Sequence, residues 1–186
     1  LLERVAACGA GAVTAKSCGP EPRAGHANPI SVEWAGGVIN AVGLTNPGMK
    51  DEVPILREAK ACLRELGVPL IASIFAPTVD DFGRMAAGIS AAEPDLIEVN
   101  ISCPNVSDDF GTPFSGSPET TAAVTRKVRE NTAIPFTVKL SSNVPSIARI
   151  ALAAEDAGAH AITAINTVPG MLIEARAASP VLSNRV

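Results

Sequence analysis

The sequence predicts an α/β fold in which parallel strands alternate with helices. Short apolar runs rich in β-branched residues recur along the 186 residues, longer stretches with helical spacing separate them, and polar residues follow each apolar run. Such an alternation makes successive strands parallel, because each helix returns the chain to the edge at which the previous strand began.

Five apolar runs are the expected strands of this sheet. Apolar residues predominate in them, so we expect both faces of the sheet to be buried. The expected strands are residues 11–16, 70–75, 96–100, 136–140 and 161–165.

Four helices are expected between these strands. The clearest beginnings are at Thr78, where Asp81 three residues later can complete a cap, and at Ser117, where Pro118 takes the first helical position. The other two helices are expected over residues 50–66, whose apolar side chains repeat at helical spacing, and over residues 145–158, where a glycine ends the run.

Polar residues at the strand ends distinguish between two possible folds, a barrel and an open, doubly wound sheet. Each strand contributes one or two of them: Lys16 with Ser17, Ser73, Asn100, Lys139, and Asn166 with Thr167. A (β/α)8 barrel builds its site from several strand ends, whereas a doubly wound sheet binds at one crossover, usually with a G-x-G-x-x-G turn. That turn is absent. The sequence therefore predicts an α/β, (β/α)8 TIM barrel that is incomplete, with about five of its eight βα units.

The bulk composition argues against several classes of protein. Apolar residues make up 47% and charged residues 18%, as in globular domains. The net charge is −4 with Lys and Arg scattered, which argues against a nucleic-acid surface. No apolar run reaches the roughly 18 residues that span a bilayer, and the start at Leu1 does not have the shape of a signal peptide. The cysteines form no C-x-x-C pair, so we expect reduced thiols, no metal site and a cytoplasmic location.

Cys103 is the strongest candidate for a catalytic residue. It lies in the loop Asn100-Ile101-Ser102-Cys103-Pro104-Asn105, directly after an expected strand. A free cysteine is usually a small buried hydrophobe, which is our interpretation of Cys8, Cys18 and Cys62. A loop thiol among polar neighbours, with an ordinary pKa of about 8.5, can instead act as a base toward a moderately acidic C–H bond.

Two lysines and two amide-rich segments are further candidates. Lys16 and Lys139 end apolar strands, where each either reaches solvent or binds an anionic ligand. The loop 40–48 is typical of simple turns, being rich in Asn, Gly and Pro. Together with Asn166 and Thr167, it would alternatively offer a neutral hydrogen-bonding surface to a small, amide-rich ring.

In order and spacing, these motifs resemble class 1 dihydroorotate dehydrogenases. The matching segments are Lys16-Ser17 with Glu21-Pro22-Arg23, NAVGLTNPG at 40–48, NISCPN at 100–105, VKL at 138–140, and Ile165-Asn166-Thr167. The resemblance covers essentially the whole chain, and its specificity lies in the combination, because each motif alone is weak. It implies oxidation of dihydroorotate to orotate, with FMN as hydride acceptor, in de novo pyrimidine (UMP) biosynthesis.

The resemblance implies a role for each matching residue. Cys103 would be the base that removes a C5 proton while the C6 hydride passes to flavin N5, and class 2 enzymes carry Ser at this position. The implied FMN contacts are Lys16, Ser17, Ser73, Asn100, Lys139 and Ile165, with Ser73 standing where many relatives have Asn. The implied substrate contacts are Lys16, Asn40, Ala41, Val42, Gly43, Leu44, Asn100, Asn105, Asn166 and Thr167.

The segment after the fifth strand resembles that of the NAD-linked subclass. Ile165-Asn166-Thr167 is followed by an expected hairpin through Met171 to Leu182. Enzymes of this subclass pass electrons to a partner subunit carrying FAD and an iron–sulfur cluster, and a homodimer is also expected. The family has one barrel strand before the matched region and Gly-rich turns for the FMN phosphate after it. Residues 1–186 are therefore expected to be the central part of a single FMN-binding TIM-barrel domain, truncated at both ends.

Two alternatives stay open. The pyrimidine-reducing domain of dihydropyrimidine dehydrogenase has a similar cysteine loop, but with His at the position of Asn105, which favours dihydroorotate. A non-catalytic barrel fragment would keep the strand-end residues without binding a cofactor. Flavin content separates this last alternative from an enzyme.

Overall fold

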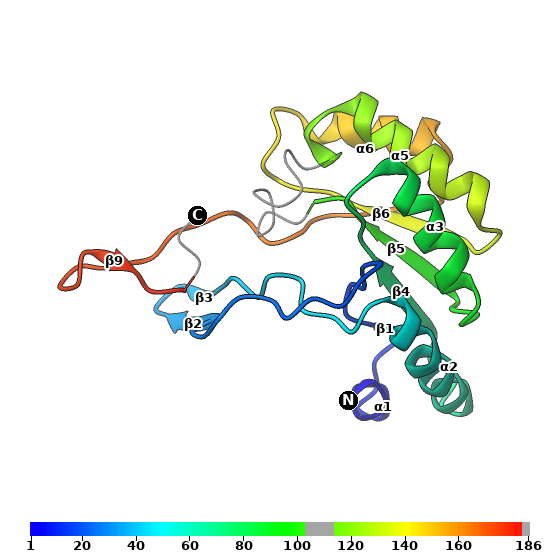
Figure 1. The fold of residues 1–186 in the computed structure, drawn as a ribbon, viewed down its shortest axis with the longest axis horizontal. Coiled ribbons are helices and arrows are strands. Elements are labelled where there is room, and N and C mark those ends of the chain that lie inside the picture. Colours follow the sequence, from blue (N-terminus) through cyan, green and yellow to red (C-terminus); the bar gives the residue numbers. More distant parts are fainter. Residues whose placement is uncertain (103–113, 184–186) are drawn as a thin grey trace.

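The computed structural model describes residues 1–102 and 114–183, and its centre is a five-stranded parallel sheet (Figure 1). The strands are β1 (Val13–Thr14), β4 (Leu70–Ile74), β5 (Leu96–Asn100), β6 (Phe136–Lys139) and β7 (Ala161–Thr163), in the order β1-β4-β5-β6-β7. All five lie where strands were expected; β5 has the expected bounds and the other four are shorter. A parallel sheet whose strands follow one another in sequence order forms part of a barrel wall. The predicted α/β class, with a partial set of βα units, is confirmed.

One face of the sheet is apolar and packs against helices. Ile74, Val99 and Val138 occupy one register level of this face and are fully buried. The helices are α1 (Leu2–Ala7), α2 (Met49–Glu65), α3 (Val79–Ser90), α5 (Pro118–Asn131) and α6 (Ile147–Asp156), with a short 3-10 turn, η2 (Phe114–Gly116). Figure 1 shows α3, α5 and α6 side by side along the sheet. Their apolar side chains and those of the strands form one continuous core.

The opposite face of the sheet is polar. Ser73 of β4 pairs in register with Glu98 of β5, which pairs with Thr137 of β6. One level further along, Asn100 pairs with Lys139. Residues paired in register point to the same side, and side chains alternate along a strand, so these groups share one face. The expectation that both faces are buried holds for these strands, because Ser73, Glu98, Asn100 and Thr137 are all buried. Their polar side chains were not expected there, and they fit a face that corresponds to the interior of a barrel and carries a site.

Strand β7 departs from the expected burial. It is the last strand of the sheet, and its residues are exposed or half-buried, with Ile162 37% exposed. Within the described residues only β6 pairs with it, so one edge and much of its surface face solvent.

The helix beginnings follow the expected caps. The Thr78 hydroxyl accepts a hydrogen bond from the N–H of Asp81 at 3.1 Å, and the Ser117 hydroxyl accepts one from the N–H of Thr120 at 3.2 Å. Both bonds satisfy a backbone donor that the first turn leaves unpaired. Helix α6 begins at Ile147 and not at residue 145, and its N-cap Ser146 makes no side-chain cap bond.

Two hairpins extend from the sheet. The second, β8 (Ile173–Glu174) with β9 (Ser179–Pro180), lies within the expected hairpin. The first, β2 (Ser31–Trp34) with β3 (Gly37–Asn40), falls in a segment that was expected to be a long loop. The N–H of Ser183 donates to the carbonyl of Pro29 at 3.1 Å and joins the two hairpin regions into one arm, residues 27–40 and 168–183.

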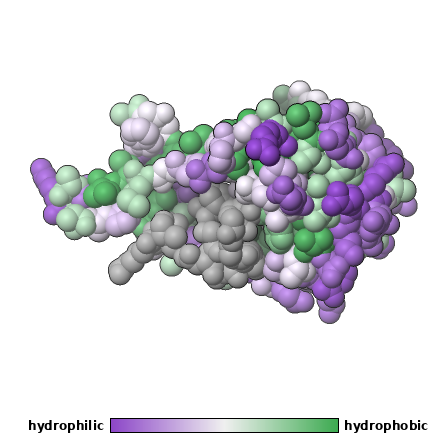
Figure 2. All heavy atoms as spheres, turned by 90° about the horizontal axis from the view of Figure 1, so that it is seen from above, coloured by the Kyte–Doolittle hydropathy of each residue, from purple (hydrophilic) through white to green (hydrophobic). Residues whose placement is uncertain are grey.

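This arm carries several exposed large apolar side chains. Trp34, Val38, Met171 and Ile173 are each more than half exposed. Figure 2 shows hydrophobic residues along the narrow arm, whereas the helix-covered part exposes mainly hydrophilic ones. Among the described residues, no helix has an apolar stretch long enough to cross a membrane.

Candidate functional site

A buried pair of hydroxyl groups links the first two strands of the sheet at their carboxyl ends. Ser17, just after β1, and Ser73, in β4, lie 2.8 Å apart between their Oγ atoms. Both side chains are buried, with residue exposures of 8% and 2%. Ser73 also donates to Oε1 of Glu98 at 3.1 Å, which extends the contact to β5.

Glu98 forms an ion pair with Lys139 on the neighbouring strand. Nζ of Lys139 lies 3.4 Å from Oε1 of Glu98, the same oxygen that Ser73 contacts. The Glu98 side chain is 8% exposed and that of Lys139 is 25% exposed. A carboxylate removed from water needs such a partner and further hydrogen bonds, because its desolvation is costly.

Asn100 connects this group to the ends of β5 and β7. Its Nδ2 donates to the Ser17 hydroxyl at 3.1 Å, and its Oδ1 accepts from the N–H of Ser102 at 3.3 Å. Asn166 completes the set, with its Nδ2 3.2 Å from the Ser102 hydroxyl and 3.4 Å from Oδ1 of Asn100. We call Ser17, Ser73, Glu98, Asn100, Ser102, Lys139 and Asn166 the strand-end network.

The segment after β1 borders this network. Lys16 lies two residues past the end of β1 and is exposed. Cys18, two residues on, is fully buried. Burial raises the pKa of its thiol to about 12, and the nearby Glu52 carboxylate acts in the same direction. Cys18 is therefore a neutral thiol at ordinary pH, which fits the structural role expected for it.

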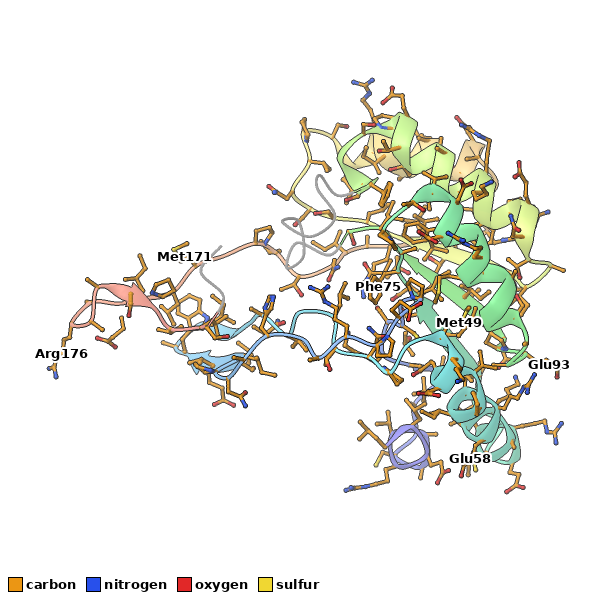
Figure 3. The ribbon with its side chains drawn as sticks, in the orientation of Figure 1. Met49, Glu58, Phe75, Glu93, Met171 and Arg176 are labelled. Carbon is orange, nitrogen blue, oxygen red and sulfur yellow. The ribbon has the colours of Figure 1, made fainter. Side chains whose placement is uncertain are left out.

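The loop 40–48 is attached to the segment after β1 by Asn46. Its Oδ1 accepts from the N–H of Gly19 at 3.1 Å and from that of Gly48 at 2.9 Å, while its Nδ2 donates to the carbonyl of Leu44 at 2.7 Å. Arg23 adds a bond from Nε to the carbonyl of Gly43 at 2.8 Å. Phe75, which lies against Gly19, stands between the sheet and the arm (Figure 3).

Gly43 is a position in this loop that requires glycine. Its φ is +76°, and an added Cβ would lie 2.8 Å from the backbone nitrogen of His26. Its neighbour Leu44 has φ of +55°, a region that non-glycine residues rarely adopt. Such strained positions are held by their surroundings and are common in ligand-binding loops.

Comparisons with known proteins agree with these motifs. The family model described as dihydroorotate dehydrogenase matches residues 1–186. The chain belongs to the dihydroorotate dehydrogenase family. The prediction of that family is therefore confirmed, and the family's fold is a TIM barrel.

Curated relatives of this chain carry the name dihydroorotate dehydrogenase B (NAD(+)), catalytic subunit. The protein of Methanocella arvoryzae is 41% identical over 99% of the chain and 59% of its own length. That of Desulforudis audaxviator is 45% identical over 95% of the chain and 56% of its own length. The chain thus spans somewhat more than half of these relatives. Their names agree with the predicted class 1, NAD-linked resemblance.

A solved structure supports the fold alone. The carboxyl transferase domain of Rhizobium etli pyruvate carboxylase with pyruvate aligns with a TM-score of 0.55 over 88% of this chain and 23% of that chain. The sequence identity is 15%, so this likeness concerns the βα architecture and not the chemistry.

The structure brings five of the expected site residues into the strand-end network: Ser17, Ser73, Asn100, Lys139 and Asn166. Ser73 contributes a buried hydroxyl. Asn40 ends strand β3, and Ala41, Gly43 and Leu44 are buried in the loop that follows, with Val42 half-buried. Ile165 is 39% exposed and Thr167 is exposed beside Asn166. Cys103 and Asn105 lie outside the described residues.

Glu98 and Ser102 are the two network residues that sequence reasoning missed. Ser102 was named only as part of the motif at 100–105. Glu98 was included in an apolar strand, Leu96-Ile97-Glu98-Val99-Asn100, although it is the charged residue in the middle of that run. An acidic residue at the centre of a buried strand requires a partner. That signal was present in the sequence.

Proposed function

We propose that the protein oxidises dihydroorotate to orotate in pyrimidine biosynthesis, with FMN as cofactor and Cys103 as the base. The observation that carries the proposal is the strand-end network. In it, residues within or just after all five strands meet at the carboxyl ends of a parallel sheet, in a chain of the dihydroorotate dehydrogenase family. Barrel enzymes place their active sites at this face.

The donors and acceptors of the site fit a flavin ring. Lys139 lies on the polar face in one network with the hydroxyl of Ser17 and the carboxamide of Asn100, and Lys16 directly precedes Ser17 in the chain. A flavin ring has one edge of alternating carbonyl and N–H groups, which hydroxyls and carboxamides can bind, and it gains negative charge on reduction, which a lysine can stabilise. When bound, FMN would accept the hydride that leaves C6 of dihydroorotate.

The remaining chemistry belongs to residues of this chain. The Cys103 thiolate would take the proton from C5 of dihydroorotate, and the described chain before it ends at Ser102, which Asn100 and Asn166 hold. Lys16 would pair with the substrate carboxylate. Asn166 and the loop 40–44 would supply hydrogen bonds to the pyrimidine ring, and Asn105 would add a carboxamide.

The electron acceptor is proposed to be NAD, reached through a separate subunit carrying FAD and an iron–sulfur cluster. The support is the name of the curated relatives, which describes each as a catalytic subunit of an NAD(+)-type enzyme. Co-purification with a subunit that confers NAD reduction would test this proposal. Equal activity with fumarate and no bound partner would contradict it.

Anaerobic titration of the purified, FMN-loaded protein tests the activity. Dihydroorotate should bleach the flavin absorbance and yield orotate, whereas dihydrouracil should leave the flavin oxidised. Asn100→Ala should weaken FMN binding, because it removes a buried partner of Ser17 and Ser102. Asn131→Ala removes an amide on an exposed helix end and is the matched control. Equal bleaching by dihydrouracil, or no bleaching by either compound, would overturn the proposal.

A further inference from the structure

Glu98 occupies an unusual position for a carboxylate. It lies in the middle of the polar face, is only 6% exposed, and uses the same oxygen, Oε1, to contact both the Lys139 ammonium and the Ser73 hydroxyl. None of the roles proposed above for substrate or cofactor requires it. A buried acid that is not a ligand contact must act through its neighbours or be replaceable by a neutral side chain.

The charge of Glu98 determines the direction of the hydrogen bonds around it. In the ion pair with Lys139 the carboxylate only accepts, so Ser73 must donate its single hydroxyl hydrogen to Glu98. Ser73 then accepts from Ser17, whose hydrogen is used for that 2.8 Å bond. Ser17 in turn must accept from Asn100, through Nδ2.

The same sequence of bonds orients the Asn100 carboxamide. The order of donation runs from Asn100 to Ser17, from Ser17 to Ser73, and from Ser73 to Glu98. With Nδ2 directed at Ser17, Oδ1 faces Ser102 and Asn166, which both supply donors to it. The partners on both sides of Asn100 therefore require the same orientation of its carboxamide. The oxygen and nitrogen of a carboxamide are nearly identical in shape, so these hydrogen bonds determine the orientation.

We propose that Glu98 is a positioning residue of the flavin site: its carboxylate balances the Lys139 ammonium and imposes one hydrogen-bond direction on Ser73, Ser17 and Asn100. The proposal rests on the proposed function, since it assigns FMN to this face. Toward a ligand, the Ser17 hydroxyl can then only accept a hydrogen bond, and the Asn100 carboxamide has one fixed orientation. It also meets a lysine whose positive charge is partly neutralised by the carboxylate 3.4 Å away.

The reduction potential of bound FMN measures the charge-balancing role without turnover. Glu98→Gln keeps the size of the side chain but leaves the Lys139 charge unbalanced, so reduction of the flavin becomes easier and the potential shifts to a more positive value. Asp95→Asn is the matched control. Asp95 precedes the same strand at its opposite end, where it pairs with Lys60 at 2.5 Å, so its loss should lower stability and leave the potential unchanged.

Ser73→Ala tests the directional role separately, because it keeps the ion pair and removes the relay to Ser17. We expect the flavin potential to shift less than in Glu98→Gln, because the ion pair stays intact. We expect orotate to bind about tenfold more weakly, because Ser17 and Asn100 are then free to reorient. This variant also decides the matter if Glu98→Gln does not fold.

The outcomes separate the two proposals. Wild-type protein that fails to bind FMN, or whose flavin dihydroorotate does not reduce, refutes the proposed function. Wild-type protein that passes both tests, while Glu98→Gln keeps the wild-type potential or Ser73→Ala keeps the wild-type orotate affinity, refutes the role of Glu98 alone.

Discussion

The hydroxyl oxygens of Ser17 and Ser73 lie 2.8 Å apart, although 56 residues separate them in the chain. Ser17 lies just past the end of β1 and Ser73 lies within β4, so the bond holds the departing chain against the neighbouring strand. Both residues belong to the expected flavin contacts. Because the two hydroxyls bind each other, both side chains are already held in position before a ligand binds, and the ligand does not have to order them.

Removing the Cys103 thiol should abolish turnover without releasing FMN. Cys103→Ala loses the proposed base, and the loss of a general base typically slows catalysis about 10²–10⁴-fold. Flavin reduction by dihydroorotate in stopped flow measures the effect. Cys62→Ala, on α2, is the control and should react at the wild-type rate. Cys103→Ser should retain partial activity with a pH profile moved upward, because a hydroxyl is a weaker acid than a thiol; near-normal reduction in Cys103→Ala would contradict the assignment.

Replacing Lys16 and replacing Lys139 should impair different steps. Lys16→Ala removes a charge-assisted bond to the substrate carboxylate, worth about 1.5–3 kcal/mol, and should weaken orotate binding accordingly. Lys139→Ala should mainly slow flavin reduction, because Lys139 is held in the strand-end network by Glu98. Orotate titrations of both variants, with rapid-reaction kinetics, distinguish the two effects. Unchanged orotate affinity in Lys16→Ala would refute its proposed contact.

Replacing Gly43 with alanine should disturb both stability and orotate binding. The residue has φ of +76°, and the new Cβ would lie 2.8 Å from the backbone of His26, so strain and a clash combine. Gly67→Ala is the matched control, with φ of +66° and nothing within 4 Å of the added carbon. We expect Gly67→Ala to cost about 1–2 kcal/mol of unfolding free energy, for the backbone alone, and Gly43→Ala to cost more. Urea unfolding measures the unfolding free energy of both variants. Equal losses in the two would contradict the prediction, because they would show that the loop can move away from His26 to make room for the added carbon.

Alkaline pH should destabilise the protein through Cys18. Burial raises the pKa of this thiol from 9.0 to about 12. Between these values the unfolded chain releases the proton and the folded chain retains it, so the unfolding free energy falls as the pH rises, by about 1.4 kcal/mol per pH unit. Cys18→Ser should remove that part of the slope, and Cys8→Ser, at an exposed cysteine, should not. Identical slopes in wild-type protein and Cys18→Ser would contradict the prediction.

Much of the local structure could be predicted because it depends on near neighbours in the chain. The caps at Thr78 and Ser117 are set by residues three positions away and were predicted correctly. Helix α6 began later than expected because Ser146 makes no cap bond to mark its start. The hairpin β2–β3 was missed because turn residues dominate residues 17–48, and its strands are largely exposed, so no buried apolar pattern revealed them.

The sequence by itself determined the family, the alternation of strands and helices, and the polar residues that end each strand, since composition, spacing and short motifs are all local properties. Only the tertiary structure decided which of those residues touch. The contact of Glu98 with Lys139 spans 41 residues and exists because β5 and β6 pair in one register, which sets Glu98 opposite Thr137 and Asn100 opposite Lys139. A shift of one residue would turn every side chain of a strand to the other face. Register is fixed by the packing of the whole sheet against its helices. The partner of the buried Glu98 carboxylate could therefore be identified only from the tertiary structure.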